Sequence, residues 1–231
     1  MSWTRLNLEE SRAIAIELGD MKRVAIALQP LGLAAMGQGD MSQARTYLKE
    51  ALQLATTINN PREVAAAKSV YAQLLRVMGE LDEAEPLYAA SLAIARELRD
   101  QEYIAISLVN LAMVFIERKQ TEQVAAMLLE ALAIGEAIGS KRTVQSIVDV
   151  AIGFAALNQD WQQAARFIGV AVTLLGETGL ARDPADEAFV APRLALVKAS
   201  LATTQYQTML ALGRAQHYAE TLRALNTWLV Q

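Results

Sequence analysis

A period of 40 residues runs through most of the chain without insertion or deletion. Between residues 18 and 178, four apolar columns recur at this spacing, and each column holds four residues. The columns are Ala44, Ala84, Val124 and Ala164; Leu52, Leu92, Leu132 and Val172; Leu54, Ile94, Ile134 and Leu174; and Leu18, Ile58, Leu98 and Ile138. Such a period is typical of a helical-repeat protein, in which each repeat packs on the next and all share one core.

Two recurring junctions divide each period into two helices. At the first junction, residues suited to a left-handed turn precede residues that cap the next helix: Gly19, Asn59, Arg99 and Gly139, followed by Asp20, Asn60, Asp100 and Ser140. The second junction lies half a period later, at Gly39, Gly79, Lys119 and Gln159. A left-handed residue other than glycine costs about 1 kcal/mol. We therefore expect the turns at Lys119 and Gln159 to be looser than the two with glycine.

The junctions predict a first helix (A) and a second helix (B) in each period. The A helices are expected at about 21–38, 61–78, 101–118 and 141–158, and the B helices at about 41–58, 81–98, 121–138 and 161–177. Residues 5–18 match a B helix with no A helix before it. Pro30 falls inside the first A helix, where it removes a hydrogen bond and is expected to cause a kink.

The expected domain organisation is a repeat region at 1–178 and a capping region at 179–231. The repeat region consists of the half repeat 5–18 and four full repeats at about 19–58, 59–98, 99–138 and 139–178. In the capping region we expect two helices, at about 185–204 and 216–229, which cover the last repeat. His217 is expected to cap the final helix.

Composition and motifs argue against catalysis. The chain has 231 residues, a net charge of −4, no cysteine and the single histidine His217. These counts exclude disulfides and cysteine zinc sites, and they argue against a histidine metal site, a Ser-His-Asp triad and a basic nucleic-acid interface. There is no GxxxxGK[ST] phosphate loop and no apolar signal core. We expect a non-enzyme without cofactor or metal, in the cytoplasm, that binds neither nucleic acid nor membrane.

The repeat resembles the tetratricopeptide repeat (TPR) family, in a variant with longer helices than the usual 34-residue unit. The A-helix pattern of large, Leu, small and aromatic or small residues is carried by Leu28, Leu31, Gly32 and Ala35, and by Leu108, Leu111, Ala112 and Phe115. The B-helix pattern is carried by Ala44, Leu48 and Ala51, and by Ala84, Tyr88 and Ser91. The resemblance implies an all-α, right-handed α–α superhelix (a TPR-like solenoid) with a C-terminal helical cap.

The tail resembles the C-terminal helical region of bacterial LuxR-type regulators and related signal-transduction ATPases. The similarity is carried by residues 164–171 (AARFIGVA), and more loosely by Gly176–Gly179 and by Tyr206 to Gly213-Arg214. It departs from that pattern between Phe189 and Ala202. The resemblance implies a bacterial setting in signal transduction or transcription regulation.

In TPR proteins the A helices line a concave groove that binds protein segments. Carried onto this sequence, the inward offsets mix apolar contacts with polar groups that can orient a peptide. They are Ile26, Gln29, Leu33, Met36, Ser69, Gln73, Arg76, Ile106, Val109, Met113, Glu117 and Asp149, and the same rows also contain Ala66, Ile116, Ser146, Gly153 and Ala156. The Lys and Asn residues that grip acidic chaperone tails in some TPR proteins are missing. Some of these residues could instead pack on neighbouring helices or form a solvated helix face.

These patterns predict a non-catalytic scaffold that binds a peptide or helix segment in its concave groove. The alternative is the ligand- or signal-peptide-sensing module of a LuxR-type ATP-dependent regulator. A closed pocket ringed by Met36, Gln73, Arg76 and Met113 would favour this alternative. A further possibility is self-association through the N-terminal half repeat near Trp3.

Overall fold

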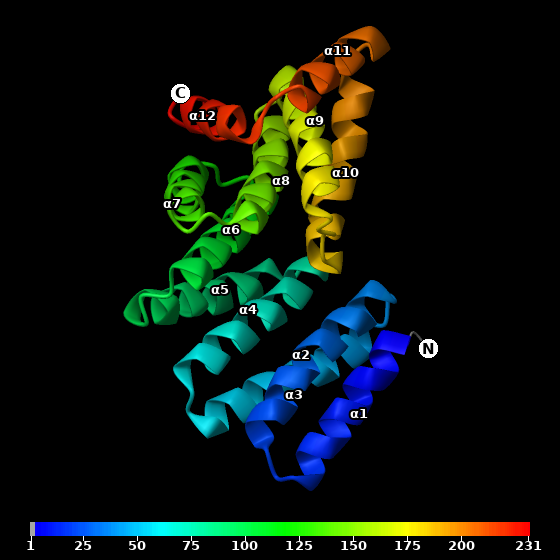
Figure 1. The fold of residues 1–231 in the computed structure, drawn as a ribbon, viewed down its shortest axis with the longest axis vertical. Coiled ribbons are helices and arrows are strands. Elements are labelled where there is room, and N and C mark those ends of the chain that lie inside the picture. Colours follow the sequence, from blue (N-terminus) through cyan, green and yellow to red (C-terminus); the bar gives the residue numbers. More distant parts are fainter. Residues whose placement is uncertain (1–2) are drawn as a thin grey trace. The chain divides into compact units, whose positions relative to one another are not determined.

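The computed structural model describes the backbone of residues 3–231 and the side chains from Leu6 onward. In this part of the chain it contains twelve α-helices and no β-strand, which confirms the predicted all-α fold (Figure 1). The A helices are α2 (Met21–Gly37), α4 (Pro61–Val77), α6 (Gln101–Glu117) and α8 (Lys141–Leu157). The B helices are α1 (Trp3–Glu17), α3 (Met41–Ile58), α5 (Leu81–Glu97), α7 (Val124–Ala137) and α9 (Trp161–Thr178). The C-terminal helices are α10 (Pro184–Ser200), α11 (Thr203–Arg214) and α12 (Tyr218–Leu229).

The chain divides into two compact units. The first comprises the residues up to Asp100 together with Asp183–Ala185, and the second comprises Gln101–Arg182 and Asp186–Gln231. Within each unit, the A and B helices of one repeat lie side by side as a hairpin. These hairpins are α2 with α3 and α4 with α5 in the first unit, and α6 with α7 and α8 with α9 in the second (Figure 1).

A left-handed residue recurs every 20 residues between helices. Among the described residues, nine have positive φ: Gly19, Gly39, Asn59, Gly79, Arg99, Lys119, Gly139, Gln159 and Gly179. In most of these turns the next N–H reaches back five residues, as from Asp40 to the Ala35 carbonyl at 3.0 Å. This bond satisfies a carbonyl that the ending helix leaves free. The regular turn explains why helix length varies so little along the repeats.

The turns at Lys119 and Gln159 differ from each other. After Lys119, α7 begins only at Val124, three residues later than predicted, and no side chain caps it. After Gln159, α9 begins at once, because Asp160 accepts a hydrogen bond from the Gln163 N–H at 3.2 Å. The expected looseness is therefore confirmed at Lys119 and wrong at Gln159. These two turns differ in the residue that follows, since Gln120 stands where Asp160 provides a cap.

Small residues let the helices of each hairpin approach closely. A Cβ added to Gly32 of α2 would lie 2.4 Å from Leu48 of α3. In the next hairpin, the Ser91 hydroxyl on α5 donates to the Ala65 carbonyl on α4 at 2.9 Å. Ala51, in the column of Ser91, is fully buried. Helix α2 continues through Pro30 to Gly37, and Pro86 and Pro192 are likewise inside helices.

The C-terminal region contains three helices where the sequence predicted two. Helix α10 ends at Ser200, and residues 203–214, for which no helix of their own was expected, form α11. The break at Ala202 has extended backbone but neither glycine nor proline, so no local signal marked it. Helix α11 packs on α9, and α12 lies against α7 and α8. His217 is the N-cap residue of α12, as predicted, and its N–H donates to the Glu220 carboxylate at 3.1 Å.

Glycines make the contact between α9 and α11 a backbone contact. A Cβ on Gly169 would lie 2.2 Å from the Leu210 carbonyl oxygen, and a Cβ on Gly213 would lie within 2 Å of the Arg166 carbonyl oxygen (1.9 Å). On α12, the Trp228 ring makes edge-on contacts with Phe154 and Phe167. The last repeat is therefore covered by two helices that lie outside the 40-residue period.

Candidate functional site

The candidate site consists of the inner faces of the A helices, taken separately in the two units. In the first unit, Ile26 is exposed, whereas Gln29, Leu33 and Gln73 are half-buried. Met36, Ser69 and Arg76 are buried. In the second unit, Ile106 and Glu117 are half-buried, and Val109, Met113 and Asp149 are buried. The polar members are the informative ones, because buried polar groups need partners.

In the first unit, the inner face of α4 holds a short piece of the chain's own C-terminal region. The Arg76 guanidinium donates to the Ala185 carbonyl at 3.2 Å. The Gln73 side-chain amide donates to the Asp183 carboxylate at 3.4 Å. Pro184, which lies between Asp183 and Ala185 in the chain, occupies the space beside Gly37 of α2. A Cβ added to Gly37 would lie 3.0 Å from the Pro184 ring. Helices α2 and α4 thus contact both backbone and side chains of residues 183–185.

In the second unit, Asp149 on α8 pairs with Arg182 in a two-pronged geometry. Arg182 donates from Nε to Oδ2 and from a terminal nitrogen to Oδ1, both at 2.8 Å. The Gln145 side chain also donates to Asp149, at 3.2 Å. Burial raises the pKa of Asp149, and the bonds from Arg182 and Gln145 act against that rise. The same pair raises the pKa of Arg182, because its guanidinium donates to the carboxylate.

Further along the second unit, an aromatic residue of α10 fills the space beside a glycine of α8. A Cβ on Gly153 would lie 2.6 Å from the Phe189 ring. Arg193 stacks on that ring, with its guanidinium carbon 3.6 Å from the ring centre, and its nitrogen is 4.0 Å from the Glu117 carboxylate. Arg193 also donates to the Phe189 carbonyl. Four residues predicted to face a ligand therefore contact residues 182–193 of the same chain: Gln73, Arg76, Glu117 and Asp149.

The arrangement can recognise a polypeptide. Its side chains can donate a hydrogen bond to a backbone carbonyl, donate an amide N–H to a carboxylate and pair carboxylates with arginine side chains. The absence of a side chain at Gly153 also leaves space for an aromatic ring. In the described part of the chain, no cluster of His, Asp and Glu has the geometry to hold a metal ion. Gln145, Arg182, Phe189 and Arg193 were not predicted from the sequence. Only Gly153 gave a signal, as a glycine in the middle of a helix.

The second unit also contains a cavity of about 460 Å³ next to Arg193. Its lining combines apolar and charged side chains: Ile116, Glu117, Lys119, Gly153, Ala156, Leu157, Gln159, Trp161, Pro192, Arg193 and Leu196. Of the four residues expected to ring a ligand pocket, Gln73 and Arg76 contact residues 183–185, and Met36 and Met113 are buried.

Comparisons with known proteins support the resemblance of the repeat. Residues 63–137 match the family model of the tetratricopeptide repeat, and this range spans α4 to α7. The crystal structure of BtubC (BKLC) from P. vanneervenii is similar to this chain over 96% of its residues and 88% of that chain, with 21% identity and a TM-score of 0.61. A search of curated proteins gave no match. In the described residues, no helix combines the length and apolar character needed to cross a bilayer. The comparisons support a TPR-type helical-repeat fold.

Proposed function

We propose that this protein is a non-catalytic interaction module that binds a segment of another protein on the inner faces of its A helices. The observation that carries the proposal is that, in each unit taken separately, these faces already hold residues of the same chain, Asp183 to Ala185 in the first unit and Arg182, Phe189 and Arg193 in the second. Arg76 binds a backbone carbonyl of this segment, and Asp149 binds one of its arginines. The match to the tetratricopeptide repeat supports the same role, since such repeats generally mediate protein–protein interaction.

It follows that a partner has to displace residues 182–193 or imitate their contacts. A matching segment would carry an arginine for Asp149 and, further along, an aromatic residue for the gap beside Gly153. In the first unit, taken by itself, a matching segment would present a backbone carbonyl to Arg76. These features describe an extended-to-helical segment, because Arg182 precedes α10 whereas Phe189 lies within it.

The test uses the full chain with Phe189→Ala, which weakens the hold on its own segment. A fluorescein-labelled synthetic peptide of residues 181–196 is titrated into this variant and followed by fluorescence anisotropy. We expect saturable binding that is weaker with the wild-type chain, because its own segment occupies the site. Adding Asp149→Asn should weaken peptide binding by about tenfold, because the buried carboxylate that holds arginine is lost.

A matched control changes a carboxylate on an exposed part of a B helix. Glu97→Gln, combined with Phe189→Ala, should leave peptide binding unchanged, since Glu97 is exposed. Circular dichroism of each variant checks that it is folded. Binding that is absent, or that is insensitive to Asp149→Asn, would contradict the proposal. With cell extract, a captured partner should be released by excess peptide; capture that the peptide does not reverse argues against this site.

The alternative is a ligand-sensing module of a LuxR-type ATP-dependent regulator in the bacterial cytoplasm, acting in signal transduction and transcription regulation. It is supported by the resemblance of residues 164–171 and by the cavity beside Trp161 and Arg193. A thermal-shift screen of small anionic and apolar compounds tests it. A hit that Trp161→Ala abolishes would favour the sensor, whereas a screen without hits would favour the scaffold.

A third possibility is self-association through the N-terminal half repeat. Light scattering over a range of concentrations tests it. The Trp3 side chain, which the sequence placed near this surface, lies outside the described side chains.

A further inference from the structure

One face of α1 is open where the equivalent face of every other B helix is covered. The column that contains Ser11 also contains Ala51, Ser91, Ala131 and Ala171. These four are buried to at least 99% of their surface, whereas Ser11 is exposed. Ile14 is 49% exposed and Leu18 is 70% exposed, more than their equivalents in α3, α5 and α7.

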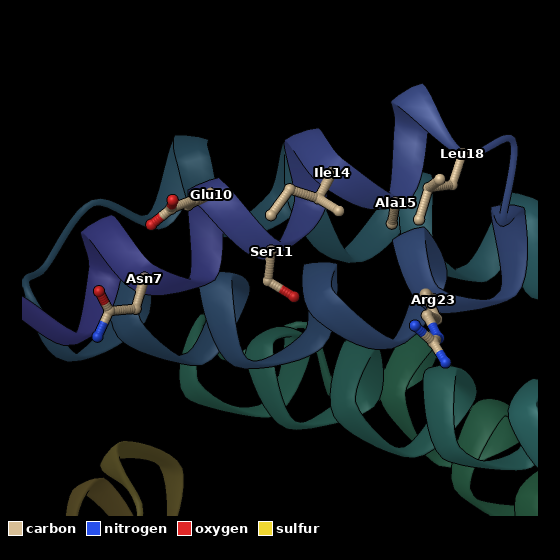
Figure 2. Close-up of a pocket in the computed structure, with 7 residues that line it drawn as sticks. All are labelled: Asn7, Glu10, Ser11, Ile14, Ala15, Leu18 and Arg23. Atoms are coloured by element: carbon tan, nitrogen blue, oxygen red, sulfur yellow. The ribbon is translucent and has the colours of Figure 1, made fainter.

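The open face forms a shallow cavity of about 250 Å³ in the first unit. Figure 2 shows Asn7, Ser11, Ile14 and Leu18 following one another along α1, with Arg23 near the Leu18 end. Their spacing of three and four residues places them on one helix face. Ala15 also lines this cavity but is itself buried, and α1 packs on α2.

The other repeats show what covers this face. In the α2–α3 hairpin, Gly32 of the A helix lies directly over Leu48 of the B helix. In the α4–α5 hairpin, the Ala65 carbonyl of the A helix accepts the hydrogen bond from Ser91, the equivalent of Ser11. The first three A helices carry two small residues seven positions apart on this contact face. The pairs are Ala25 and Gly32, Ala65 and Ala72, and Ala105 and Ala112, and all six residues are buried.

We propose that the α1 face defined by Asn7, Ser11, Ile14 and Leu18 docks an amphipathic helix of a partner protein that carries two small residues seven positions apart. The docked helix would continue the repeat interface, with the Ser11 hydroxyl donating to one of its backbone carbonyls. The first three A helices of a second copy do not present such a pair, because their small residues are already buried against their own B helices.

The probe is a labelled synthetic peptide of residues 60–78, which contains α4 and its cap. It is titrated into the full wild-type chain and followed by fluorescence anisotropy. We expect saturable binding that Ser11→Arg or Ile14→Glu weakens by about tenfold or more, since either change blocks close helix approach. Both residues are exposed, so these variants are expected to fold. Leu196→Glu alters an equally exposed apolar residue on α10 and should leave binding unchanged.

A control peptide with Ala65→Leu and Ala72→Leu keeps helix propensity but removes the small-residue pair. It should bind about tenfold more weakly than the parent peptide. Absence of binding by the parent peptide, or binding that survives Ser11→Arg, would overturn the proposal. So would a dimer of the wild-type chain that sedimentation detects and Ile14→Glu abolishes, because the face would then belong to a second copy. Ser11→Arg should not affect binding of peptide 181–196. A negative result for the α1 face can therefore be distinguished from a negative result for the inner-face site.

Discussion

The first and last B helices, α1 and α9, occupy equivalent positions in the repeat but have different surroundings. On α1, Ser11 is exposed, whereas its equivalent Ala171 on α9 is buried. On the outer side of α9, Gly169 lies under α11, but its equivalents Lys49 and Ala89 are exposed. The comparison teaches that the recurring columns propagate the interior of the repeat, whereas the presence or absence of a helix that reaches each end decides whether that end is covered.

The largest effect on stability is expected for a substitution at the contact between α9 and α11. Gly169→Ala should destabilise the protein by about 3 kcal/mol, because the new Cβ would collide with backbone atoms of α11 rather than with a side chain that can move. Urea denaturation followed by circular dichroism measures the change. The control is Gly176→Ala in the same helix, where a Cβ meets nothing within 4 Å. It should stabilise the protein by about 0.5 kcal/mol through helix propensity. Equal effects of the two substitutions would mean that α11 does not pack on α9.

A pair of matched substitutions compares the open face with its covered equivalent. Ala51→Leu should destabilise the protein by about 2 kcal/mol, because Ala51 is fully buried in the hairpin contact. Ser11→Leu should change stability by less than about 0.5 kcal/mol, because Ser11 is exposed. Thermal and urea denaturation of both variants measures the difference. If Ser11→Leu destabilises as much as Ala51→Leu, the α1 face is covered in solution.

Substitutions in the turns between helices are expected to change the stability of the protein least. Gly39→Ala should cost about 1 kcal/mol, because Gly39 has φ +80° and the space around it is open, so only backbone strain opposes the change. Lys119→Gly should stabilise the protein by about 0.5 kcal/mol, since it relieves strain at φ 59° at some cost in chain entropy. The same denaturation measurements test both. A stabilising effect of Gly39→Ala would contradict the strain argument.

Most helices were predictable because the signals that define them are local. Eight of the nine repeat helices begin within about two residues of the predicted position, at caps such as Asp40 and Asp160. The exception is α7, where Gln120 stands in place of a short capping side chain. Helix α11 was missed because the break at Ala202 carries no glycine or proline. Both misses occur where a tertiary contact or the absence of a cap replaces the local signal.

The candidate site was predicted only in part. The sequence identified Gln73, Arg76, Glu117 and Asp149 as inward residues, but it contained no sign that the chain's own residues 182–193 contact them. The contact between Gln73 and Asp183 joins residues 110 positions apart. Periodicity reports on neighbours within one or two repeats and carries no information about contacts at that distance along the chain.

The sequence by itself determined the all-α class, the 40-residue repeat and nearly all helix boundaries of this protein. Each of these follows from caps, left-handed turns and apolar columns that act over a few residues. Only the tertiary structure decided that residues 182–193 lie on the inner faces, that α11 covers α9 and that α1 keeps one face open. Those features depend on contacts between distant segments, and whether Gly169 or Ser11 is covered is set by which helix reaches it and not by its neighbours in sequence.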